Sequence, residues 1–168
     1  MYLHRNLLWQ RSDKERTKQI EYKSQTVPSW SWMVYDGGIE FINIPWYKVD
    51  WINDLEFDKE RNDALTTGIG GFLDCKIEKE GNRYTILDLD GTQRGWIQYD
   101  VEWNGDVHME RCVVVGKIPN EAEDAFSVKK YYILVVRPTS MDGEYKRVGV
   151  GLIQCNYVSL QRLPVRVV

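Results

Sequence analysis

The sequence has no long apolar run and no excess of positive charge. Charged side chains interrupt every apolar stretch of the 168 residues well short of the roughly 20 that a membrane-spanning helix needs. His4 and Arg5 precede only a brief apolar stretch, which is too short for a signal peptide. The 22 basic residues are outnumbered by 25 acidic ones, so no positive field favours nucleic-acid phosphates. We therefore expect neither a membrane nor a nucleic-acid partner.

Cysteine and histidine are scarce. The three cysteines, Cys75, Cys112 and Cys155, form no C-x-x-C pair. Neither His4 nor His108 has a metal-ligand spacing to any of them. Each cysteine lies in an apolar or alternating run, which favours a small buried side chain over a reactive thiol. The sequence thus predicts no metal site and a reducing, cytoplasmic compartment.

Motifs of nucleophilic and phosphate chemistry are also missing. There is no Gly-x-Ser-x-Gly, and two histidines leave little room for a Ser-His or Cys-His pair. The glycine-rich Gly68-Ile69-Gly70-Gly71 has no Lys-Ser/Thr after it and leads into a predicted strand. A phosphate loop needs a helix N-terminus instead. We expect no cofactor.

Carboxylates are numerous, and a glycosidase would need two of them facing each other across a cleft. They are Asp74, Asp88, Asp90, Asp100, Glu102 and Asp106. Positions beside turns and on alternating strand residues are equally typical of a solvated β surface. We therefore predict a chain that is not an enzyme and has no catalytic residue. A hydrolase that uses a pair such as Asp88 and Asp100 is a weaker alternative.

Aromatic residues are abundant, since 7 Trp, 10 Tyr and 4 Phe make up 12% of the chain. Together with the β-branched residues they bury enough apolar surface to offset the ordering entropy, which excludes a disordered chain. No internal repeat, low-complexity tract or linker divides the sequence. The length favours one compact domain, and we expect a single all-β domain over residues 1–168.

Turn signals at short intervals separate runs rich in Val, Ile, Tyr, Trp and Thr, the pattern of antiparallel strands. The turn signals are Asp36-Gly37-Gly38, Gly81-Asn82, Asp90-Gly91, Asn104-Gly105 and Asp142-Gly143. The predicted strands are Trp30–Tyr35, Ile39–Ile44, Gly71–Glu78, Arg83–Leu89, Gly95–Val101, Arg111–Ile118, Tyr131–Arg137 and Tyr145–Asn156. The sequence predicts a mainly β fold, an antiparallel sandwich or partly open barrel of about eight to ten strands with little helix.

The clearest hairpin joins the last two of these runs. Tyr131–Val136 is almost wholly apolar, so we expect both of its faces to be covered. Pro138 and the turn at Met141-Asp142-Gly143 follow it. In the returning strand, Gly149 and Gly151 predict a bulge, a bend or the close approach of another backbone.

Helix is expected only in short pieces. Asp13–Ile20 is polar and rich in good helix formers, and Ser12 is a possible cap, although a loop fits equally well. Asn120–Phe126 can form one turn. The charge-dense Asp54–Asp63 indicates a solvated loop between two β segments.

The most unusual local feature is Val27-Pro28-Ser29-Trp30-Ser31-Trp32. In a strand, Trp30, Trp32 and Val34 share one face. Two indoles on one face bury on the order of 200 Å² each, so we predict a core strand.

An exposed aromatic platform that stacks a sugar or a base is a different use of tryptophan. Trp46, Tyr47 and Trp51 fit it best, because they lie in a loop-like stretch of mixed polarity. Packing is the competing interpretation for these three side chains.

Several short elements resemble, in order, the region C-terminal to the HET domain of fungal heterokaryon-incompatibility proteins. The Pro28–Trp32 run followed by Asp36-Gly37 resembles the P-S-W-S-W-A-S-x-D-G signature of that family. The upstream Leu7–Ser12 is similar to an L-L-W-R-R-S element. Leu8 and Trp9 are the matching core of that element. Residues that match further along the chain are Gly71, Leu73, Arg137, Pro138, Tyr145, Arg147, Gly149 and Gly151. Met33-Val34-Tyr35 departs from the small residues of the family pattern, so packing around that segment must differ.

The resemblance implies a non-catalytic accessory or interaction domain that acts in fungal non-self recognition and regulated cell death. The α/β half that carries the conserved HET blocks has no counterpart here, so the chain resembles an excised or stand-alone C-terminal portion. Its implied partner is that N-terminal half or another protein. The alternative is a small-molecule or carbohydrate-binding β module that uses Trp46, Tyr47 and Trp51.

Overall fold

A computed structural model describes residues 2–12, 18–22, 27–58, 64–67, 70–73, 76–80, 83–101, 110–118, 129–162 and 164–168. Within these residues, the helical elements are α1 (Tyr2–Asn6) and three 3-10 turns, η1 (Trp32–Val34), η2 (Trp46–Lys48) and η3 (Cys155–Tyr157). The short strands are β1 (Trp9–Arg11), β2 (Lys18–Gln19), β3 (Tyr35–Asp36), β4 (Ile39–Phe41), β5 (Asp50–Trp51), β6 (Glu56–Phe57), β7 (Leu65–Thr67) and β16 (Val165–Val167). The longer strands are β8 (Gly70–Leu73), β9 (Lys76–Glu80), β10 (Arg83–Leu87), β11 (Gln93–Tyr99), β12 (Arg111–Ile118), β13 (Lys130–Pro138), β14 (Glu144–Gln154) and β15 (Val158–Gln161). The prediction of a mainly β fold is confirmed.

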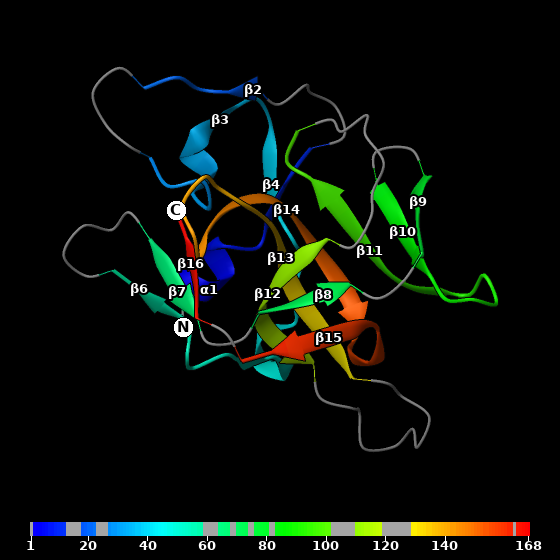
Figure 1. The fold of residues 1–168 in the computed structure, drawn as a ribbon. Helices are drawn as coiled ribbons and strands as arrows, with labels where there is room; N and C mark the ends of the chain where they lie inside the picture. The colour runs from blue at the N-terminus through cyan, green and yellow to red at the C-terminus, as the bar shows by residue number, and fades with distance from the viewer. Residues whose placement is uncertain are drawn as a thin grey trace.

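The longer strands form one continuous sheet in the order β15-β8-β12-β13-β14-β11-β10-β9, with antiparallel pairing throughout (Figure 1). The short strands β5, β6, β7 and β16 attach beside this path. The first and last strands of the path, β15 and β9, each pair with one described strand. No helix of the described residues is long and apolar enough to cross a membrane.

The predicted β13–β14 hairpin is confirmed. Its strands pair from Lys130↔Gln154 to Pro138↔Tyr145, and Gly143 has a φ of 72° in the connecting turn. That left-handed conformation suits glycine, which has no Cβ to clash with the following carbonyl. Residues Tyr132–Val136 are all buried, as expected of a strand covered on both faces.

Two glycines let β14 lie unusually close to β11. A Cβ on Gly151 would be 2.5 Å from the Trp96 carbonyl oxygen, and one on Gly149 would be 2.6 Å from the Gln98 carbonyl oxygen. Only glycine leaves room for the partner backbone at these distances. Of the three predicted causes, the structure shows close approach of a backbone and also a β-bulge, since the β13–β14 register shifts where Val148 lies between Arg147 and Gly149.

The N-terminal arm consists of α1 and the described residues 7–12, 18–22 and 27–44. Its strands pair among themselves, β1 with β4 and β2 with β3. Leu7, Leu8, Ile42 and Ile44 from this arm belong to the same buried cluster as the central sheet residues Val113–Val115. The arm thus packs on the sheet through apolar side chains. It also places Leu7, Trp9 and Ser29 beside Arg147 of β14.

Three predictions about local structure are wrong in part. Within Asp13–Ile20, residues 13–17 lie outside the described residues, but Lys18–Gln19 is strand β2 because it pairs with β3. Gly71–Glu78 is not one strand, since β8 pairs with β12 whereas β9 pairs with β10. The predicted loop Asp54–Asp63 contains strand β6, and its residues 59–63 lie outside the described residues. Also outside them are Asn120–Phe126 and the turns Gly81-Asn82 and Asn104-Gly105.

Candidate functional site

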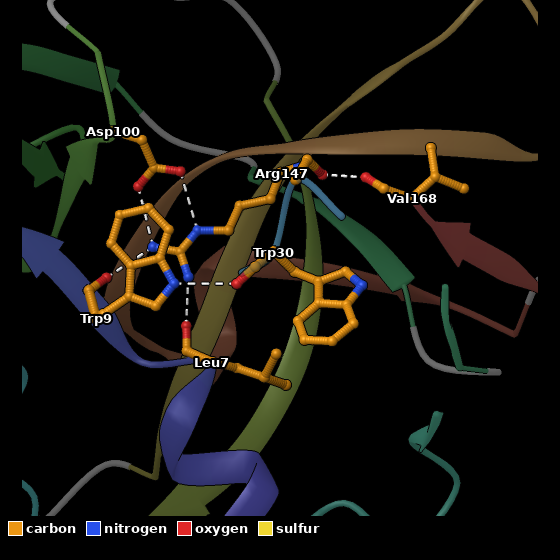
Figure 2. Close-up of polar contacts among 7 residues, drawn as sticks. Leu7, Trp9, Trp30, Asp100, Arg147 and Val168 are labelled. Carbon is orange, nitrogen blue, oxygen red and sulfur yellow. Dashed lines mark hydrogen bonds and ion pairs between the residues drawn. The ribbon is translucent and has the colours of Figure 1, made fainter. Parts of the chain in front are cut away.

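Arg147 of β14 is the centre of a buried polar cluster formed by the motif residues (Figure 2). Its guanidinium forms a bidentate ion pair with Asp100, with Nε–Oδ2 and Nη2–Oδ1 distances of 2.9 and 3.0 Å. It also donates to the carbonyl oxygen of Leu7 and, at 2.6 Å, to that of Trp9. Burial raises the pKa of the Asp100 carboxyl, and the attraction of Arg147 opposes that rise.

Trp9 covers the guanidinium of Arg147. The Cζ atom lies 3.5 Å from the centre of the indole ring, a distance typical of a cation–π contact. The Trp9 Nε1 donates to the carbonyl oxygen of Trp30 at 3.0 Å, which ties the second motif to the first. The Tyr35 ring packs on Trp9 with centroids 5.4 Å apart, and burial raises the pKa of Tyr35.

Ser29 connects the cluster to the last residues of the chain. Its hydroxyl accepts a hydrogen bond from the Arg147 backbone N–H at 2.9 Å and donates to the Val168 carbonyl oxygen. The Ser29 N–H donates to that same oxygen at 3.0 Å. Leu7 and Trp9, Ser29 and Trp30, and Arg147, which are far apart in the sequence, thus meet at one place, and Arg147 is entirely buried there. The cluster is a structural clamp rather than an accessible site.

The predicted core strand Trp30–Tyr35 is wrong. Trp32 begins the 3-10 turn η1, whose cap is Ser31, with the hydroxyl accepting from the Met33 N–H at 3.3 Å. This turn leaves Trp32 47% and Met33 50% exposed, while Val34 alone of the turn is buried. Trp30 is half-buried against Phe57. Strand alternation does not apply because a 3-10 turn rotates its side chains by a third of a turn per residue.

The remaining motif residues also have structural roles. Asp36 ends strand β3 and Gly37 has a φ of 119°, which explains the Asp-Gly pair. Arg137 pairs with the buried Glu110 at 2.5 Å, and Tyr145 accepts a hydrogen bond from Arg111. Pro138 is the exposed last residue of β13.

The predicted platform of Trp46, Tyr47 and Trp51 is only partly exposed. Tyr47 on η2 is 86% exposed. Trp51 instead packs inward, with its ring centroid 5.7 Å from that of His4. The side chain of Trp46 lies outside the described residues. The structure therefore does not bring Tyr47 and Trp51 onto one surface, because the β5–β12 pairing turns Trp51 toward the core.

The carboxylate pair Asp88 and Asp100 does not face one cleft. Asp88 accepts from the Thr92 N–H at 2.8 Å and pairs with Arg94, and these contacts lower its pKa. Asp100 lies beyond the other end of β11, a separation of roughly 20 Å. Asp90 is exposed in the turn, while Asp74, Glu102 and Asp106 lie outside the described residues.

Cysteine and histidine show no common site within the described part of the chain. Cys112 is buried and Cys155 half-buried, both as free thiols. The described residues contain no group of three or more His, Cys, Asp or Glu side chains that could hold a metal ion. Cys75 and His108 lie outside these residues.

A cleft of about 480 Å³ lies beside the Arg147 cluster. We call it the Lys146 cleft. One wall is partly apolar and comes from the N-terminal arm, and the other comes from the start of β14, from β16 and from Val168. Its lining residues are Gln19, Ile20, Tyr22, Val27, Ser29, Val34, Glu144, Lys146, Arg166 and Val168. The sequence pattern draws attention to Val27, Ser29 and Val34, but nothing local indicates that they meet β14.

Comparison with known proteins leaves these residues to be interpreted from their own chemistry. No protein-family model, curated protein or solved structure matches this chain.

Proposed function

We propose that the chain is a non-catalytic protein-interaction domain of the kind found C-terminal to HET domains, and that its docking surface is the Lys146 cleft. One observation carries the proposal. The motif residues are used to clamp the N-terminal arm onto β14, and the wall that this clamp holds in place is open and partly apolar. Open apolar surface beside polar residues is typical of protein interaction sites.

The exposed aromatic turn extends this surface. Trp32 and Met33 project from η1, and Tyr22, whose hydroxyl donates to the Met33 carbonyl oxygen at 2.6 Å, connects the turn to the cleft wall. Exposed Trp, Met and Tyr side chains are enriched at protein interfaces. The implied biological role is non-self recognition and regulated cell death, with the HET α/β half as partner.

The test is co-elution. The chain would be mixed at micromolar concentration with a separately expressed α/β half of a fungal HET protein that carries the same ordered elements. We expect a complex on size exclusion, and we expect Trp32→Ala to weaken it with at most a small loss of melting temperature. A chain that elutes alone with every such half would contradict the proposal.

A carbohydrate-binding module is the second candidate, favoured by the high exposure of Tyr47 on η2. A glycan screen read by tryptophan fluorescence separates the two functions. A saturable shift that Tyr47→Ala abolishes would support the carbohydrate function, since sugars stack on exposed rings.

A further inference from the structure

The two walls of the Lys146 cleft differ in chemistry. The arm presents the aliphatic side chains of Ile20 and Val27 between polar groups of Gln19 and Ser29, while Val34 is buried. The backbone N–H of Ile20 donates to the Val34 carbonyl oxygen at 2.7 Å, so this wall is held in place by the arm itself. A partner side chain that enters here is met by aliphatic surface.

The opposite wall is cationic. Arg166 pairs with Glu144 at 2.8 Å, and Thr139 also donates to Glu144 at 3.1 Å, so the acid on this wall is neutralised. Lys146 has no hydrogen bond or ion pair with any described residue, and its side chain is exposed. The net charge presented by the cleft lining is therefore positive, although the chain as a whole is acidic.

The shape favours a polypeptide over a small molecule. The cleft volume of about 480 Å³ lies within the range of small-ligand pockets, roughly 300–1,000 Å³. However, the exposed Trp32 and Met33 continue the apolar surface outside the cleft, beyond what a small ligand would cover. A segment several residues long could place apolar side chains on both regions.

Strand β2 borders this surface with an edge that no described strand occupies. It pairs with β3 alone, and Gln19 of β2 lines the cleft. Edge strands present free backbone N–H and C=O groups to an extended peptide. The bound segment can therefore gain main-chain hydrogen bonds as well as side-chain contacts.

From these features we infer that the Lys146 cleft binds an extended segment of a partner polypeptide in which acidic side chains alternate with apolar ones. The acidic side chains would contact Lys146, and the apolar ones would contact the exposed Ile20 and the half-buried Val27. This inference rests on the proposed interaction function and specifies the chemistry of its partner.

The probes are three fluorescein-labelled octapeptides. In the first, Asp alternates with Val. In the second and third, Asn or Lys replaces every Asp. We expect fluorescence anisotropy to show saturable binding of the Asp peptide, roughly tenfold or more tighter than the Asn peptide. The Lys peptide should bind more weakly still. Added salt should lower the affinity for the Asp peptide more than for the other two, because ions screen the attraction between exposed charges.

Two variants assign the binding to the cleft. Lys146→Glu should lower the affinity for the Asp peptide by roughly tenfold or more. Ile20→Ser should lower the affinities for the Asp and Asn peptides by the same factor. Lys130→Glu is the matched control, since Lys130 is also exposed but lies at the far end of the β13–β14 hairpin, roughly 20 Å away. The melting temperature of each variant verifies that it folds.

The outcomes separate the inference from the proposed function. Equal affinity for the Asp and Asn peptides, or an equal loss in Lys146→Glu and Lys130→Glu, overturns the inference. Neither result bears on the proposed function, which is tested independently by co-elution with the HET half. A chain that binds the Asp peptide through Lys146 supports the inference, whichever partner protein supplies the segment.

Discussion

The guanidinium of Arg147 lies 3.5 Å from the ring centre of Trp9 while it holds Asp100 in a bidentate ion pair. Three segments that are remote in the sequence meet at this contact. The N-terminal arm is attached to the sheet by it, and the arm forms one wall of the Lys146 cleft. The stability of the clamp and the geometry of the cleft are therefore linked.

Removal of the Arg147 charge should strongly destabilise the fold. Arg147→Met leaves the Asp100 carboxylate buried without its partner, which typically costs about 3–5 kcal/mol of unfolding free energy. Urea unfolding measures the loss. The neighbouring Lys146→Met is the control and should change the free energy by less than about 0.5 kcal/mol, because Lys146 is exposed. Equal losses in the two variants would contradict the clamp.

The tryptophans of the two motifs should differ in their effect on stability. Trp9 is entirely buried, so Trp9→Ala should lower the free energy of unfolding by about 3–5 kcal/mol. Trp32 is exposed on η1, and Trp32→Ala should cost less than about 1 kcal/mol. Thermal unfolding of the two variants side by side checks this. If the ranking were reversed, Trp32 would have to be a core residue.

A side chain at Gly151 should separate β11 from β14. Gly151→Ala places a Cβ 2.5 Å from the Trp96 carbonyl oxygen, and overpacking of this kind typically costs about 1–3 kcal/mol. Gly91→Asn is a suitable comparison, because its site is open and Asn tolerates the left-handed φ of 77°. We expect a loss of melting temperature in the first variant that clearly exceeds that in the second.

Stability should depend on pH through His4. Burial beside Trp51 lowers the pKa of His4 below its ordinary value of 6.5. The unfolded chain therefore binds this proton at a higher pH than the folded chain, and stability falls as the pH drops through about 6.5. His4→Phe removes the proton-binding group and keeps an aromatic ring.

The measurement is the difference in melting temperature between the wild type and His4→Phe across pH 5 to 8. We expect this difference to shift against the wild type as the pH falls. Parallel curves would show that the folded and unfolded chains bind the His4 proton equally.

Turn residues and apolar runs correctly predict the hairpins. Gly143 and Gly91 take positive φ in their turns, and the apolar run Tyr132–Val136 is buried. Each of these features depends on residues within a few positions of one another, so propensity and turn chemistry were sufficient to predict them.

Predictions from local sequence are wrong where contacts with distant parts of the chain decide the structure of a segment. Alternation suggested a strand at Trp30–Tyr35, but Ser31 caps a 3-10 turn, and the Trp9 Nε1 bonds the Trp30 carbonyl oxygen instead. At Trp51, pairing with β12 directs the ring into the core, which no neighbouring residue indicates.

A mainly β chain with short turns thus follows from the order of its β-branched, aromatic and glycine residues, because those preferences act over a few bonds. The partner of Arg147, the exposure of Trp32 and the Lys146 cleft are properties of the tertiary structure alone. Arg147 and Leu7 are 140 positions apart, and Ser29 and Val168 are 139 apart. Contacts at that separation leave no local periodicity, since they are selected by how the arm packs on the sheet.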